Sequence, residues 1–212
     1  MSEGLDNFST VVTTLATVGA VCIAWMGLTT WKAQIKWQTD HDLARRLLVE
    51  IYRFRDAVGA ARSPRVSAHE MRDDDTSASP GIPTSKERHA GMRRAFQRRF
   101  SEIGINAPQL YALLLETEAV WGPELSVIWR DVNRLQNELS SETGLYLDFL
   151  ESKDAGADPT NFYPDQSAQM AARKIIYSNG ESEGNNDFSN RMKAAISRLE
   201  DYLRPKLGRP AQ

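Results

Sequence analysis

Residues 41–62 read HDLARRLLVEIYRFRDAVGAAR, and their apolar side chains set how the rest of the chain must pack. These side chains recur three and four positions apart, which places them in one line along a helix. They are Ala44, Leu47, Ile51, Phe54, Val58 and Ala61. One helix cannot bury such a line alone, so the pattern predicts further helices packed against it. Thr39 or Asp40 can cap this helix, and Ser63-Pro64 ends it.

The rest of the chain after residue 62 is also patterned as helices and loops. We expect helices over residues 86–103, 108–121, 123–151, 166–178 and 187–203. Between them lie loops over residues 63–85, 152–164 and 179–186, which are rich in Pro, Gly, Asn and Asp. No strand-like alternation extends beyond a few residues. The predicted fold is therefore all-α, an antiparallel helical bundle with a mobile loop at 63–85.

An uncharged segment precedes this bundle. Residues 7–31 carry no charged side chain, and residues 11–28 read VVTTLATVGAVCIAWMGL. At ~1.5 Å per residue such a helix measures about 37 Å, more than the ~30 Å of a bilayer's hydrocarbon core. We therefore expect a single transmembrane helix within residues 1–37 and a bundle domain over residues 38–212. The transmembrane helix either ends before residue 41 or continues without a break into the helix of residues 41–62.

Two other interpretations of the uncharged segment are weaker. A signal peptide begins with basic residues and ends at small ones, whereas residues 1–6 contain no Lys or Arg and the apolar run is too long. A buried helix of a soluble protein fits poorly, since the segment ends in Trp31, Lys32, Lys36 and Trp37. These basic residues follow the segment and none precedes it. The positive-inside rule then places the bundle in the cytoplasm.

Composition narrows the function further. All 26 Lys and Arg, and all but Glu3 and Asp6 of the 28 Asp and Glu, lie in residues 32–212, which are therefore formally neutral. This balance argues against a nucleic-acid partner. Cys22 is the only cysteine and lies inside the uncharged segment, so the chain has no disulfide within itself and no cysteine-based zinc site.

A resemblance supports the membrane location. Residues 44–58 read ARRLLVEIYRFRDAV and are followed by Arg62-Ser63-Pro64. Together with the uncharged segment and Trp31-Lys32, they resemble uncharacterised single-pass inner-membrane proteins of bacteria over residues 10–70. The resemblance implies the bacterial cytoplasmic membrane, with membrane lipid as a partner. It implies no activity and no catalytic residue.

Two sets of arginines are candidate anion-binding residues. Arg93, Arg94 and Arg98 fall opposite the apolar face of the helix 86–103, where they predict a solvent-facing basic stripe for anionic lipid headgroups, RNA or a phosphorylated ligand. The alternative is a solvated helix face, partly neutralised by Asp73 to Asp75. Arg55 and Arg62 are seven residues apart on one helix face, so they can bind a phosphate or carboxylate together, or tie their helix to its neighbours.

One charged residue falls among apolar ones in each of two helices. Arg99 projects between Phe96 and Phe100, and Glu142 occupies an apolar position of the helix 123–151. A buried Arg99–Glu142 ion pair is one interpretation, because a buried charge needs a partner. The other is that Arg99 reaches solvent along its stem, while Gly144 shifts the phase of the other helix.

No metal or organic cofactor is expected. His41, His69 and His89 share no ligand spacing, and the acidic segment 69–75 lacks the glycine turn of a calcium loop. The chain also lacks phosphate-binding, dinucleotide and nucleophile motifs.

A line of small residues in the uncharged segment predicts self-association. Close approach of two membrane helices requires small side chains on one face. Here they are Thr13, Ala16, Ala20, Ala24 and Gly27.

Three functions fit these features. The first is a membrane-anchored cytosolic interaction or scaffold module with an unidentified protein partner. The second is a membrane effector or sensor of a bacterial stress or phage-defence system. The third is an enzyme that acts on a phosphorylated or lipidic substrate in a pocket between helices.

Overall fold

The protein is all-α over the residues that its computed structural model describes. These are residues 2–72, 84–156, 158–178 and 186–208, with side chains from Gly19 onward except at positions 106 and 159. The helices and one 3₁₀ turn are α1 (Ser2–Ala61), α2 (Ala68–Met71), α3 (Ser85–Trp121), α4 (Glu124–Asp154), η1 (Pro159–Asn161), α5 (Gln166–Ile176) and α6 (Asp187–Leu207). No strand occurs in this part of the chain, so the predicted all-α class is confirmed.

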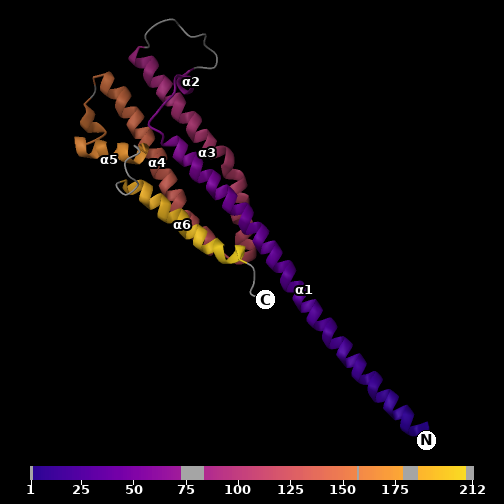
Figure 1. Ribbon diagram of the computed structural model, residues 1–212. Coiled ribbons are helices and arrows are strands. Elements are labelled where there is room, and N and C mark those ends of the chain that lie inside the picture. Colours follow the sequence, from indigo (N-terminus) through magenta and orange to yellow (C-terminus); the bar gives the residue numbers. More distant parts are fainter. Residues whose placement is uncertain (1, 73–83, 157, 179–185, 209–212) are drawn as a thin grey trace.

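Four long helices form an antiparallel bundle (Figure 1). α1 packs against α3 and α6, and α4 packs against the same two helices from the opposite side. The chain runs up α1, down α3, up α4 and down α6, as in up-down-up-down bundles. α5 packs on α4 and α6 at one end of the bundle, and α2 packs on α3.

The predicted line on α1 forms the centre of the core. All six of its members are at most 3% exposed: Ala44, Leu47, Ile51, Phe54, Val58 and Ala61. On α4 the buried side chains include Leu125, Val132, Leu135, Leu139, Tyr146 and Phe149. Thr143 is buried where the sequence placed Glu142, and its hydroxyl donates to the Leu139 carbonyl at 2.7 Å.

Two helix boundaries were predicted wrongly. A break was expected before Pro108, but α3 is one helix of 37 residues with this proline inside it. Ile103 and Leu110 lie seven residues apart, and both are buried in the same core. The line of core side chains therefore continues across the proline and outweighs its lost hydrogen bond. α6 likewise runs past Pro205 to Leu207.

α1 is a single helix of 60 residues, so the predicted alternative in which it runs on through Trp37 is the one observed. Its first half projects from the bundle (Figure 1). The large apolar side chains of this half that the structure describes, from Val21 to Ile35, are in contact with solvent. Trp25 is 69% exposed and Ile23 68%. Among the described residues, no helix has the length and apolar character that a membrane span needs. Residues 11–18 of the predicted span lie outside the described side chains.

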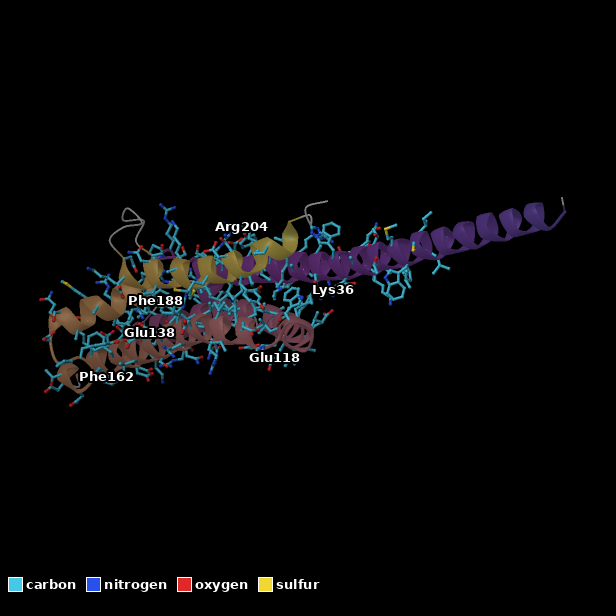
Figure 2. The ribbon with its side chains drawn as sticks, turned by 90° about the horizontal axis from the view of Figure 1, so that it is seen from below. Lys36, Glu118, Glu138, Phe162, Phe188 and Arg204 are labelled. Carbon is cyan, nitrogen blue, oxygen red and sulfur yellow. The ribbon has the colours of Figure 1, made fainter. Side chains whose placement is uncertain are left out.

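Indole groups hold the point where α1 leaves the bundle. The Trp37 Nε1–H donates to the Gly208 carbonyl at 2.7 Å, and the Trp121 Nε1–H donates to Asp40 Oδ1 at 2.8 Å. Figure 2 shows Lys36 close to this point. These two hydrogen bonds attach the C-terminal ends of α3 and α6 to residues 37–40 of α1.

The predicted mobile loop contains a short helix that sequence reasoning missed. α2 begins with a capping box in which Ser67 and Glu70 satisfy each other's backbone N–H groups. Residues 73–83, which include Asp73 to Asp75, lie outside the described part of the chain.

Candidate binding groove between α1 and α6

Arg55 and Arg62, the two arginines predicted to act together, line one groove between α1 and α6. The groove has a volume of about 490 Å³. Val58 and Gly59 of α1 and Met192 and Ile196 of α6 form its apolar part. A Cβ atom added at Gly59 would meet no atom within 4 Å, so the absence of a side chain there leaves the groove open.

Arg62 lies at one end of the groove and is 5% exposed. Its Nε donates to the Ile175 carbonyl at 2.8 Å and its Nη2 to the Lys174 carbonyl at 3.0 Å. Both carbonyls belong to the last turn of α5, which carries the negative end of the helix dipole. Arg62 therefore stabilises the end of α5 without an ion pair to any described carboxylate.

The beginning of α6 surrounds the rest of the same guanidinium group. Nη1 donates to Ser189 Oγ at 2.9 Å, and the guanidinium carbon lies 4.5 Å from the centre of the Phe188 ring. Burial lowers the pKa of Arg62 to about 10. Arg62 stays protonated at neutral pH, so a positive charge remains buried at the end of the groove.

Arg55 lies nearer the middle of α1 and is largely exposed. Its guanidinium carbon lies 4.7 Å from the centre of the Tyr52 ring, and its Nε donates to Asp56 Oδ1 at 2.9 Å. Burial raises the pKa of Tyr52, and the negative charge of Glu200 and its hydrogen bond with the Tyr52 hydroxyl raise it further. Tyr52 and Glu200 thereby join α1 to α6 beside the groove.

The groove favours an anionic ligand. Arg55, Arg62 and Lys193 contribute positive charge to its lining, against the single carboxylate of Glu200. The first turn of α6 adds the positive end of a helix dipole, with Ser189 and Asn190 on the groove wall. A carboxylate or phosphate bound here would lie beside these positive groups and would be repelled by only one carboxylate of the lining, that of Glu200.

The predicted solvent-facing basic stripe on α3 was wrong, because all three arginines contact other helices. Arg93 forms ion pairs with Asp148 at 2.9 Å and Glu151 at 3.0 Å of α4, and their hydrogen bonds raise its pKa. Arg94 donates to the Met71 carbonyl and Arg98 to the His69 and Glu70 carbonyls, which holds α2 on α3.

The predicted Arg99–Glu142 pair is also wrong. Arg99 forms its ion pair with Glu70 and donates to the Ser63 carbonyl at 2.7 Å. The hydrogen bond from Arg99 is the main reason that the pKa of Glu70 falls to about 2. Glu142 instead lies near Tyr163, where burial and this negative charge raise the tyrosine pKa to about 12. The sequence did contain a pattern that indicates a helix start at this place, because Ser67 and Glu70 have the spacing of a capping box.

Histidines and acidic residues form no metal centre in the described structure. No three His, Cys, Asp or Glu side chains cluster there. His41 Nδ1 lies 3.2 Å from the Leu207 carbonyl oxygen, and His89 pairs with Asp154 at 2.8 Å.

The predicted line of small residues is only partly described. Ala20, Ala24 and Gly27 are exposed on the projecting half of α1, whereas the side chains of Thr13 and Ala16 lie outside the described set. Gly27 has no atom within 4 Å of an added Cβ.

Comparison of the chain with protein-family models, with curated proteins and with solved structures finds no match in any of the three.

Proposed function

We propose that this protein is a membrane-anchored interaction module whose helical bundle binds an anionic partner at the cytoplasmic face. The observation that carries the proposal is the division of α1. One unbroken helix presents exposed apolar side chains between Val21 and Ile35 and contributes the centre of the bundle core with its second half. Large apolar side chains in such numbers favour an apolar environment around the projecting half.

The chemistry around this division supports the proposed orientation. Trp31 is 58% exposed and Trp37 binds the end of α6, so both indoles lie where the apolar segment meets the bundle. Indoles and lysines are favoured at the membrane–water interface, and Lys32 and Lys36 occupy this stretch. The bundle would then begin at the headgroup layer of the inner leaflet.

Membrane anchoring is tested by alkaline carbonate extraction of cell membranes. The wild-type chain is expected in the pellet, whereas Ile23→Asp combined with Val21→Asp should shift it to the supernatant, because two carboxylates oppose insertion. Val127→Asp is the matched control, since Val127 is an exposed valine of α4. Extraction of the wild type by carbonate would refute the anchor.

Orientation is tested by reporter fusions at residue 212. Fluorescence of a cytoplasmic reporter is expected, and active alkaline phosphatase at this position would overturn the proposed topology.

The groove is tested with an acidic peptide of six glutamates and the full chain in detergent. Gly59→Leu fills the groove and should weaken binding by about tenfold, or ~1.4 kcal/mol. Gly144→Leu is the matched control, since Gly144 also has no atom within 4 Å of an added Cβ but lies on α4. Equal affinity of the two variants would exclude the groove as the binding site.

A second candidate is a membrane effector or sensor, favoured by the continuity of α1 from the projecting half into the core. A helix without a break transmits a shift of the bundle to the apolar segment. Overexpression should then be toxic, and Gln38→Pro, which interrupts the helix between the two halves, should abolish toxicity without removing the protein from membranes. Toxicity that survives Gln38→Pro would exclude this coupling.

Self-association is a further part of the proposal, through the line that includes Ala20, Ala24 and Gly27. A two-hybrid assay of residues 1–38 in membranes compares Ala20→Ile with Val21→Ile. The first substitution should weaken pairing and the second should not, because only Ala20 lies in the line. Pairing of Ala20→Ile at the wild-type level would leave the segment as an anchor alone.

A further inference from the structure

A second hollow lies on the other side of α1, between α1 and α3. Its volume is about 480 Å³. Arg45, Arg46, Glu50 and Arg53 line it from α1, and Glu116 lines it from α3. None of these residues takes part in the α1–α6 groove.

Glu50 is the unusual residue of this hollow, because it is a carboxylate that is only 4% exposed. Its Oε1 accepts a hydrogen bond from Arg53 Nη1 at 2.7 Å. Its Oε2 is buried and accepts none from any described residue. A buried carboxylate oxygen without a donor is costly, so this atom favours a ligand that carries an N–H group.

The arginines around Glu50 restrict which ligand can supply that group. Arg46 is paired with Glu116 at 3.0 Å, whereas Arg45 is exposed and has no partner among the described residues. The lining carries three guanidinium groups against the carboxylates of Glu50 and Glu116, so its net positive charge disfavours a ligand with positive charge alone. A ligand with negative charge alone would leave Glu50 Oε2 without a donor. An ammonium group beside an anionic group satisfies both requirements.

We propose that the α1–α3 hollow binds a compact zwitterion, with its ammonium group on Glu50 Oε2 and its phosphate or carboxylate on Arg45 and Arg46. Two sources offer this chemistry. The hollow begins about 12 Å along α1 from Trp37, at ~1.5 Å per residue, which brings a phosphoethanolamine lipid headgroup within reach of an anchored bundle. A free amino acid or aminoalkyl phosphate is the other source.

The experiment is calorimetric titration of the full chain in an uncharged detergent with three probes. O-phosphoethanolamine carries both charges, ethanolamine only the positive one and inorganic phosphate only the negative one. O-phosphoethanolamine should bind at least about tenfold more tightly than either of the others. Binding of all three with equal affinity, or of none, would overturn the proposal.

Variants identify the groups that bind. Glu50→Gln keeps the size of the side chain and removes its charge. The affinity of this variant for O-phosphoethanolamine should therefore fall to its affinity for inorganic phosphate. Arg45→Gln should weaken binding of O-phosphoethanolamine by about tenfold. This variant keeps the proposal testable if Glu50→Gln does not fold. Arg198→Gln is the control, since Arg198 pairs with Asp131 on a distant face. Unchanged affinity in both Glu50→Gln and Arg45→Gln would refute the site.

Nanodiscs distinguish the two sources. If the lipid headgroup is the ligand, O-phosphoethanolamine should bind in discs of phosphatidylglycerol but not in discs of phosphatidylethanolamine, where the site is already filled. If the ligand is free, the probe should bind equally in both. Because the soluble titration does not depend on anchoring, failure of the membrane proposal and failure of this one are separate results.

Discussion

Arg62 joins three helices and also lines the proposed binding groove. Its guanidinium group joins the end of α1 to the last turn of α5 and the first turn of α6. The sequence correctly offered the alternative of a tie between helices. It could not identify the partners, because the Lys174 carbonyl lies 112 residues away and a backbone acceptor leaves no mark in the pattern.

The first prediction follows from these bonds. Arg62→Ala leaves the α5 carbonyls without their donors and opens a cavity, so it should lower the free energy of unfolding by about 3 kcal/mol. Arg55→Ala is the matched control and should cost less than about 1 kcal/mol, because Arg55 is exposed. Urea unfolding followed by circular dichroism measures both. Equal losses would mean that the buried bonds contribute little.

Glu70 gives a prediction about pH. Its pKa in the folded protein is about 2, below the ordinary value of 4.5, so the fold favours the ionised carboxylate. The ionised carboxylate contributes about 1–3 kcal/mol to the free energy of unfolding. This contribution is complete above pH 4.5 and is lost as the pH falls toward 2. The protection factors for amide hydrogen exchange of residues 65–72, which compare each measured rate with the intrinsic rate at the same pH, should therefore fall over this range.

Glu70→Gln separates this effect from the other carboxylates. The variant cannot titrate at position 70, so residues 65–72 should have lower protection factors than in the wild type at pH 7, and these factors should change less between pH 4.5 and 2. The same acid response in variant and wild type would assign it to other groups.

At the scale of elements, apolar spacing predicted which helix faces are buried better than it predicted where helices end. The line on α1 is buried as expected, because burial of such a line is the main stabilising contribution to a helix. Pro108 was taken as a helix start, since proline is favoured at that position. The continuing core contacts of Ile103 and Leu110 keep α3 unbroken instead.

Pro108→Ala distinguishes the two possibilities. Inside a continuous helix, alanine restores the backbone donor and removes the clash of the proline ring, so the variant should be more stable by about 1–3 kcal/mol. At the start of a separate helix the proline would be favourable, and the same substitution would leave stability unchanged or lower it. Thermal unfolding measures the sign directly. A lower melting temperature would contradict the unbroken α3.

At the scale of the whole molecule, α1 connects a projecting half, whose described side chains are exposed, to a half that is buried in the bundle core. From Leu43 onward its buried side chains belong to the four-helix core, whereas the side chains of residues 19–36 are exposed. The sequence marked this division by the change from uncharged residues to a charged helix with an apolar line. It left open whether the helix is continuous, because neither Gly nor Pro lies between Trp31 and Trp37 and no other local feature decides the matter.

The last prediction tests whether the two parts are separable. Deletion of residues 2–31 removes no side chain from the described core, so the remaining chain should unfold cooperatively and within about 1 kcal/mol of the full chain. Trp37 and Asp40 remain to hold Gly208 and Trp121. A further deletion through residue 45 removes Leu43 and Ala44 from the core and should lower stability by more than about 3 kcal/mol. Loss of cooperative unfolding after the first deletion would show that the projecting half of α1 is required for the fold.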